Sequence, residues 1–284
     1  MKTIGNQYII KTDLDNGATA TVYLVECIKT GKIYAAKLYD KINDDNKTEI
    51  EILKRLSSSN NPYIIHLISW GEEYILIDGV AENNEKKLFI IIDYLPNKDL
   101  FSYIKSNKID ENMAKNLFYK ILKAVEYCHS QGICHRDIKL ENILLNEKNE
   151  PVLCDFGYGS LSIENLKYYI GSEHYYPPEI LRHKPYNGIK SDIFSLGVLL
   201  FVLVFKSYGF ETATFNDYLY KLIMKKKFSA YWNNIGNIYG EEKVKVVSLD
   251  CKKLIFKMLA FSPIDRPSIK DILNSNWLKD VQKK

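Results

Sequence analysis

Residues 135–142 read His135-Arg136-Asp137-Ile138-Lys139-Leu140-Glu141-Asn142, and Asp155-Phe156-Gly157 follows them. Charged and amide side chains are closely spaced in both strings. Five specified residues of this kind would recur by chance in a chain of 284 residues with a probability on the order of 10⁻⁴. These strings are therefore the most specific signal in the chain, and the rest of the sequence is interpreted around them.

The sequence on both sides of these strings has a helical pattern. Upstream, apolar residues from Ala114 to Cys128 recur at i, i+3 and i+4 spacing, and Gly132 ends this helix. Downstream, residues 193–205 are apolar on every side, which predicts a buried central helix rather than a membrane span, because the run is short for a bilayer. Residues 215–224 and 249–259 predict amphipathic helices.

The first third of the chain reads mostly as strands. Short β-branched or aromatic runs, separated by turn residues, lie at 8–10, 22–25, 33–38 and 88–92. One helix is expected around Lys47 to Leu56, and Leu95-Pro96-Asn97 breaks the pattern. The chain therefore predicts a small β-rich lobe, a hinge near Asp93–Asn97 and a larger helical lobe, with a ligand in the cleft between them.

Composition excludes several classes of protein. Hydrophobic residues make up 46% of the chain and charged residues 26%, with 14 Gly and 8 Pro, which excludes collagen, low-complexity disorder and a coiled-coil rod. The net charge of +4 is too small to indicate nucleic acid or an anionic membrane as the main partner. No internal repeat is visible.

Five cysteines, an odd number and mostly in apolar strings, indicate a reduced cytoplasmic or nuclear protein rather than a secreted disulfide scaffold. The N-terminus has neither the apolar stretch of a signal peptide nor a glycine at position 2 for myristoylation, so no membrane anchor is expected.

The ordered motifs resemble those of the eukaryotic protein kinases, with an H-R-D-x-K-x-x-N catalytic loop and a D-F-G element. Further matches follow in family order from about Tyr8 to Trp277: Lys37 in Tyr34-Ala35-Ala36-Lys37, Glu49, Pro177-Pro178-Glu179, Asp192 and Arg266. The resemblance is to the Ser/Thr type, and most to the calcium/calmodulin-dependent and AMP-activated group. It implies a bilobal α+β fold in one domain, 1–284, with an antiparallel β-rich N-lobe at about 1–92 carrying one regulatory helix, a hinge at 93–97, a mainly helical C-lobe at 98–279 and a polar tail at 280–284.

The resemblance also implies roles for the matched residues in transferring the γ-phosphoryl group of ATP to protein hydroxyls. Asp137 would orient the substrate hydroxyl and accept its proton, and Lys139 would stabilise charge on the phosphoryl group. Asn142 and Asp155 would bind Mg²⁺, a cation that prefers hard oxygen ligands. Lys37 would hold the α- and β-phosphates and pair with Glu49.

An adenine pocket and hinge follow from the same resemblance. The residues expected to bind ATP are Leu14, Gly17, Val22, Ala35, Lys37, Ile92, Asp93, Leu95, Asp99, Glu141 and Leu144. Leu53, Leu67, His135 and Phe156 match the apolar stack that joins the lobes in this family, with Asp192 at its base.

The phosphate-binding loop departs from the family pattern G-x-G-x-x-G-x-V. Asp15 stands at the first glycine position and Ala20 at the third, and only Gly17 is kept. Glycine lets the backbone approach phosphates, and Asp15 adds a negative charge near a polyanion. We expect weakened, but not abolished, ATP binding.

Lys139 and the Gly171-Ser172 pair resemble Ser/Thr kinases rather than tyrosine kinases, so protein substrates are expected. Asp99 and Glu141 match acidic positions that pair with an upstream arginine of the substrate in basophilic relatives. Exposed acids are common, and Asp99 could instead bind ribose, so substrates with basic residues near the target are one of two alternatives.

Regulation is left open between three alternatives. Arg136 before the catalytic aspartate usually accompanies a phosphorylated activation loop. In relatives the acceptor is a threonine at the position of Tyr168, so either Tyr168 or Tyr169 is phosphorylated, or Ser160 or Ser162 substitutes, or no phosphate is needed. Ser172 occupies the position that usually contacts the catalytic aspartate.

Other residues have more than one interpretation. Cys128-His129 and Cys134-His135 do not fit the spacing of a zinc finger. Residues 225–227 are three lysines, which are typical of a solvated helix end. Cys154 is either a core residue or an accessible thiol. The main rival to an enzyme is a nucleotide-binding pseudokinase scaffold, motivated by the degenerate loop and opposed by the intact catalytic set. The oligomeric state, the substrate and the activator are not predicted.

Overall fold

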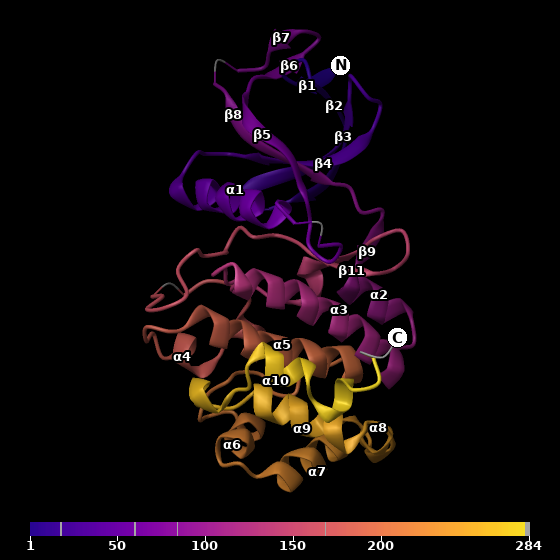
Figure 1. The fold of residues 1–284 in the computed structure, drawn as a ribbon, viewed down its shortest axis with the longest axis vertical. Helices are drawn as coiled ribbons and strands as arrows, with labels where there is room; N and C mark the ends of the chain where they lie inside the picture. Colours follow the sequence, from indigo (N-terminus) through magenta and orange to yellow (C-terminus); the bar gives the residue numbers. More distant parts are fainter. Residues whose placement is uncertain (18, 60, 84, 168, 282–284) are drawn as a thin grey trace. The chain divides into compact units, whose positions relative to one another are not determined.

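The computed structural model describes residues 1–17, 19–59, 61–83, 85–167 and 169–281. The chain forms two compact units, Met1–Pro96 and Asn97–Lys284 (Figure 1). The boundary between them falls inside the segment expected to be the hinge. The first unit is mainly antiparallel sheet and the second mainly helix, which confirms the expected α+β class.

The first unit is built on one sheet and one helix. The strands in spatial order are β5 (Leu67–Glu73), β8 (Lys87–Asp93), β4 (Ile33–Tyr39), β3 (Ala20–Cys27), β2 (Tyr8–Asn16), β1 (Lys2–Ile4), β6 (Ile75–Ile77) and β7 (Val80–Ala81). The helix is α1 (Asp44–Ser57), which starts earlier than expected because Asn43 and Asn46 form a reciprocal capping box. In Figure 1 the sheet is curled, and β1 pairs with β6 near one end of the strand order.

The register of the central strands separates the two faces of this sheet. Val22 lies opposite Lys37, and Lys37 opposite Ile90, while Ala35 lies opposite Ile92. Because directly paired residues and those two positions apart share a face, all five lie on one side of the sheet. The alternate residues form a buried cluster on the other side: Ile4, Tyr8, Val25, Ala36, Leu38, Ile75, Phe89 and Ile91.

The second unit has a small sheet, β9 (Asn97–Asp99), β10 (Ile143–Leu145) and β11 (Pro151–Leu153), in the order β11-β10-β9. Its helices are α2 (Leu100–Ser106), α3 (Glu111–Ser130), α4 (Pro178–Leu181), α5 (Gly188–Phe205), α6 (Tyr218–Met224), α7 (Phe228–Tyr239), α8 (Glu241–Val246), α9 (Leu249–Met258) and α10 (Ile269–Leu273). Single 3₁₀ turns lie at Leu140–Asn142, Glu173–Tyr175, Pro263–Asp265 and Asn276–Leu278.

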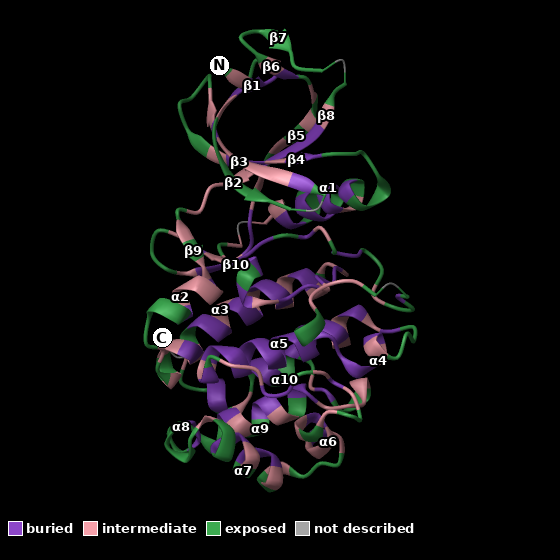
Figure 2. Cartoon of the chain, turned by 180° about the vertical axis from the view of Figure 1, so that it is seen from behind, coloured by how far each residue is buried: buried purple, intermediate pink, exposed green. Residues whose placement is uncertain are grey.

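Helix α5 is the core of the second unit, as its apolar run predicts. It is buried along nearly its whole length, visible as the purple helix in Figure 2. It is the one described helix that is long and apolar enough to cross a membrane, and 83% of it is buried inside the unit. Gly188 at its start packs closely on Cys134, the residue before the 135–142 loop, because a Cβ on Gly188 would lie 2.3 Å from Cys134 Sγ.

Candidate active site

The catalytic loop of the second unit is fixed by a buried carboxylate on α5. Asp192 accepts hydrogen bonds from the backbone N–H groups of His135 and Arg136 at 2.9 and 2.8 Å. Arg136 adopts a positive φ of 65°, which a non-glycine residue takes only when its surroundings hold it there. His129 Nε2 lies 2.9 Å from the same carboxylate. Asp192 therefore determines the path of the backbone that enters Asp137.

His135 has a defined tautomer. Its Nδ1 accepts from the backbone N–H of Asp137 at 3.3 Å, so the ring proton is on Nε2, which donates to the Cys154 carbonyl at 3.0 Å. The ring packs on Phe156 at a centroid distance of 4.8 Å. The loop before Asp137 and the strand end before Asp155 are therefore joined through one imidazole.

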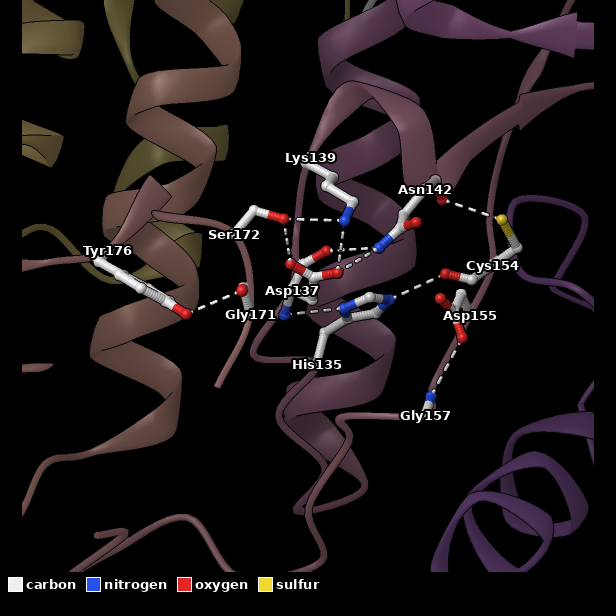
Figure 3. Close-up of polar contacts among 10 residues, drawn as sticks. All are labelled: His135, Asp137, Lys139, Asn142, Cys154, Asp155, Gly157, Gly171, Ser172 and Tyr176. Carbon is white, nitrogen blue, oxygen red and sulfur yellow. Dashed lines mark hydrogen bonds and ion pairs between the residues drawn. The ribbon is translucent and has the colours of Figure 1, made fainter. Parts of the chain in front are cut away.

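Asp137 is nearly buried, and its carboxylate accepts three side-chain contacts (Figure 3). Oδ1 accepts from Ser172 Oγ at 2.9 Å, and Oδ2 accepts from Asn142 Nδ2 at 2.9 Å. Lys139 Nζ lies 2.9 Å from Oδ2 and donates to Ser172 Oγ at 2.8 Å. Four sequence-predicted residues, Asp137, Lys139, Asn142 and Ser172, therefore form one network around a single carboxylate.

The charge on Lys139 is secured by its neighbours. Burial, the largest single influence, lowers its pKa, but the hydrogen bond and charge of Asp137, with the charges of Glu141 and Asp155, raise it more. The net result is a pKa above the ordinary value of 10.5. Lys139 therefore remains a cation at neutral pH, as stabilisation of an anionic group requires.

Asn142 and Asp155 provide the oxygen atoms expected for Mg²⁺. The Asn142 amide nitrogen donates to Asp137 Oδ2 and to the Asp137 carbonyl, so its Oδ1 is the atom left for a cation. Asp155 is exposed and has a positive φ of 60°. No group of three His, Cys, Asp or Glu side chains suited to a metal lies within the described ranges. Two protein ligands fit Mg²⁺, which usually keeps waters and substrate phosphates as its other ligands.

In the first unit, Lys37 and Glu49 form an ion pair. Lys37 Nζ lies 2.8 and 3.0 Å from the two carboxylate oxygens of Glu49, whose side chain is 3% exposed. Tyr39 donates its hydroxyl to Glu49 Oε2 at 2.9 Å. Strand β4 and helix α1 are therefore joined through one buried carboxylate.

The residues predicted for adenine lie in different environments. Val22, Ala35 and Ile92 share the sheet face of Lys37, and Leu14 is 41% exposed. Asp93 Oδ2 lies 3.2 Å from His66 Nδ1, and Leu95 is half-buried. In the second unit, Asp99 and Leu144 are cross-strand partners.

Strands β2 and β3 pair antiparallel on either side of the segment expected to bind phosphate. Gly17 donates its N–H to the Ala20 carbonyl at 3.0 Å. Asp15 Oδ1 accepts the Asn16 N–H at 2.8 Å, so the extra carboxylate is fixed locally. Ala20 is buried. Both departures from glycine are accommodated without breaking the hairpin.

The two acidic positions expected to read a basic substrate differ. Asp99 is the N-cap of α2, and its two oxygens accept from Ser102 N and Ser102 Oγ, both at 2.8 Å. Glu141 is exposed in the turn after Lys139. Glu141 is therefore the freer of the two carboxylates.

The segment between Asp155 and Glu179, called the activation segment below, contacts Arg136 through its backbone carbonyls. The guanidinium donates to the Tyr158 carbonyl at 2.6 Å and to the Gly159 carbonyl at 3.3 Å. Ser160 is buried, and its hydroxyl donates to the Ser162 carbonyl at 2.9 Å. Ser162 and Tyr169 are exposed, while Tyr168 lies outside the described residues. The burial of Ser160 removes it from the accessible phosphate acceptors.

Two tyrosines in these networks were not predicted from the sequence. Tyr39 holds Glu49, and its position two residues after Lys37 on the same strand face was an available signal. Tyr176 donates to the Gly171 carbonyl at 2.8 Å, and nothing local in the sequence indicates this contact.

The alternative interpretations of the cysteines are also decided by contacts. Cys154 is buried and its thiol donates to the Asn142 carbonyl at 3.1 Å, so it belongs to the core. Cys134 Sγ faces the carbonyls of Ser160 and Ser162, and burial raises its pKa to about 12. Within the described residues, neither Cys128 nor Cys134 belongs to a group of three His, Cys, Asp or Glu side chains that could hold a metal.

Comparison with known proteins identifies the family. A model of the family described as "Protein kinase domain" matches residues 8–278. CBL-interacting serine/threonine-protein kinase 13 of Arabidopsis thaliana is 31% identical over 287 residues, covering 96% of this chain and 51% of the relative. Maternal embryonic leucine zipper kinase of Xenopus laevis is 32% identical over 282 residues, covering 95% and 39%. Serine/threonine-protein kinase SIK1 of Mus musculus is 32% identical over 281 residues, covering 96% and 32%.

This chain spans about half the length, or less, of these curated relatives. The similarity covers nearly the whole of this chain, and it confirms the resemblance to the calcium/calmodulin-dependent and AMP-activated group of Ser/Thr kinases.

Proposed function

The chain belongs to the protein kinase domain family, and on that premise we propose that it is a serine/threonine protein kinase that transfers the γ-phosphoryl group of Mg-ATP to protein hydroxyls. The observation that carries the proposal is the network in which Asp137, Lys139, Asn142 and Ser172 meet around one carboxylate. Phosphoryl transfer depends on such positioning and charge neutralisation more than on covalent chemistry.

The proposed roles follow from the contacts. Asp137 accepts the proton of the substrate hydroxyl, because its carboxylate oxygens are acceptors that donors on two sides hold in place. Lys139 supplies positive charge beside it. When bound, Mg-ATP supplies the phosphoryl group and the divalent charge that neutralises it. Asn142 Oδ1 and Asp155 would hold the cation, and Lys37, oriented by Glu49, would hold the phosphates.

The test is transfer of labelled phosphate from Mg-ATP, at millimolar ATP, to a basic Ser/Thr protein. Wild type is compared with Asp137→Asn and Asp155→Ala, and with Asp250→Asn as a matched surface carboxylate on α9. We expect transfer by wild type and the control, and losses of roughly 10²-fold or more in Asp137→Asn. The absence of transfer by wild type with either Mg²⁺ or Mn²⁺ would contradict the proposal and favour the pseudokinase scaffold.

We further propose that the substrates are proteins with an arginine upstream of the target Ser/Thr, and that Glu141 rather than Asp99 recognises it. The support is that Glu141 is exposed, whereas Asp99 is occupied as a helix cap. In a peptide array, wild type should prefer basic residues, and Glu141→Gln should weaken that preference more than Asp99→Asn. A preference for acidic residues would contradict it.

Activation and location are proposals of the same kind. Of the acceptors predicted from the sequence, Ser160 is buried, Ser162 and Tyr169 are accessible, and Tyr168 remains as predicted. If mass spectrometry of active protein finds no phosphate between Asp155 and Glu179, only the phosphate-independent alternative remains.

A cytoplasmic or nuclear location is supported by five free thiols, and cell fractionation would test it.

A further inference from the structure

Tyr176 connects the segment beside the catalytic network to a buried cluster of the second unit. Its ring is 8% exposed and packs with Cys134, Leu166, Ile180 and Tyr186. Its hydroxyl reaches out of this cluster and donates to the Gly171 carbonyl at 2.8 Å. Figure 3 shows this contact on the opposite side of Gly171-Ser172 from Asn142. The ring is therefore an anchor whose polar end holds one specific carbonyl.

A second ring covers the anchor. Tyr169 lies against Tyr176 with ring centroids 4.6 Å apart, and against His183 at 5.2 Å. His183 follows α4 at a positive φ of 51° and donates its N–H to the Ile180 carbonyl at 2.9 Å. Aromatic pairs at these distances attract beyond the area they bury. Tyr169 therefore closes the exposed side of Tyr176.

The carbonyl that Tyr176 holds belongs to a residue that cannot move freely. Gly171 has a φ of +110°, and a Cβ there would lie 2.7 Å from the Arg136 carbonyl oxygen. Arg136 is adjacent to Asp137, so Gly171 is packed directly against the catalytic loop. The next residue, Ser172, donates its hydroxyl to Asp137 Oδ1 at 2.9 Å and accepts from Lys139.

We propose that Tyr176, covered by Tyr169, is a positioning residue for phosphoryl transfer: its hydroxyl fixes the Gly171 carbonyl and so holds the Ser172 hydroxyl on Asp137. This rests on the proposed kinase activity. Neither tyrosine touches the reacting atoms, and both act through Ser172. The sequence suggested phosphate acceptance for Tyr169, whereas the geometry gives its ring a role that needs no phosphate.

The decisive variant is Tyr176→Phe, which keeps the buried ring and removes only the donor to Gly171. Tyr218→Phe, at an exposed tyrosine of α6, is the matched control. A second pair separates ring from hydroxyl at the covering position: Tyr169→Ala removes the ring and Tyr169→Phe keeps it. The active fraction of each protein is counted by titration with a nucleotide analogue, and hydrogen–deuterium exchange of residues 169–176 is measured without substrate.

We expect Tyr176→Phe to lower kcat/KM for a peptide substrate about tenfold, the usual effect of one lost hydrogen bond, with KM for ATP unchanged. Amides of residues 169–176 should exchange faster in Tyr176→Phe and in Tyr169→Ala than in wild type. Tyr169→Phe should have the wild-type kcat/KM and the wild-type exchange rate. Tyr218→Phe should match wild type.

Two results would overturn the inference. One is that Tyr176→Phe has the wild-type kcat/KM for the peptide, per nucleotide-binding site, and also the wild-type rate of amide exchange. The other is a loss confined to the active fraction, which would indicate a purely structural role. If wild type transfers no phosphate, the kinase proposal fails, but the exchange measurement still decides whether Tyr176 and Tyr169 hold the Gly171-Ser172 segment.

Discussion

Arg266 and Glu179 form a two-pronged ion pair inside the helical unit. Arg266 Nη1 and Nη2 donate to the two carboxylate oxygens at 2.6 and 2.7 Å, and the Arg266 side chain is fully buried. The remaining guanidinium donors reach the carbonyls of Ala260 and Lys190 at 2.9 Å and of Phe261 at 3.4 Å. The short helix α4 is thereby tied to the C-terminal part of the chain.

Removing Arg266 should therefore strongly destabilise the protein. Arg266→Ala leaves the Glu179 carboxylate with no cation, and we expect a loss of about 3–5 kcal/mol in the free energy of unfolding, measured by urea denaturation. Lys184→Ala removes an exposed lysine near the end of α4 and should change stability by less than about 0.5 kcal/mol. Equal midpoints for the two variants would contradict the prediction.

Tyr39 should affect catalysis through Glu49. Tyr39→Phe removes a donor to the buried carboxylate that pairs with Lys37, so we expect kcat/KM for ATP to fall about tenfold, and further in Glu49→Gln. Tyr34→Phe, on the same strand with its ring on the opposite face, is the control. Steady-state kinetics at varied ATP would measure the effect, and no difference between the two Phe variants would exclude a role for the Tyr39 hydroxyl.

The degenerate phosphate loop should respond to restoration of its glycines. Asp15→Gly combined with Ala20→Gly should lower KM for ATP about tenfold, because it removes a charge and a methyl from the phosphate side. Asp15→Asn alone should account for about threefold, and this part should shrink at high salt. Asp13→Asn, on the same strand, is the control. A wild-type KM already in the low micromolar range would refute the premise.

The Lys139–Asp137 pair should contribute to stability over the whole neutral range. The pKa of Lys139 is raised in the folded state, so its contribution is fully present below the ordinary 10.5 and is lost as pH rises through the higher folded value. The difference in Tm between wild type and Lys139→Met should therefore be constant from pH 6 to about 9.5 and fall above about 10.5. A difference that vanishes between pH 7 and 9 would show that Lys139 titrates earlier.

Much of the fold could be predicted from periodicity. Helix α5 is apolar on every side, and such a helix has only the interior of a unit in which to lie. The change from strand to helical pattern near Pro96 matches the boundary of the two units. Strands β1 and β6 were missed because they have three residues each and are defined by pairing with each other, which a local pattern does not contain. Strand β2 extends to Asn16 through pairing with β3, although its second half is polar and exposed.

The part of the site that could be predicted consists of residues that belong to an ordered sequence motif. Asp137, Lys139 and Asn142 were found because their spacing is specific. Tyr176 was not, because its role depends on which carbonyl its hydroxyl meets, and this is set by tertiary packing. The burial of Ser160 likewise follows from its bridge to Cys134, which the sequence does not reveal.

Helix α5 also has a consequence for how the protein is made. The chain leaves the ribosome from its N-terminus, so residues 188–205 are synthesised before α9, which packs on them. At about 5–20 residues per second, the most apolar segment of the protein remains without that partner for several seconds. During synthesis the face of α5 that α9 later covers is therefore left exposed for a time, and slower translation through residues 206–258 lengthens that time.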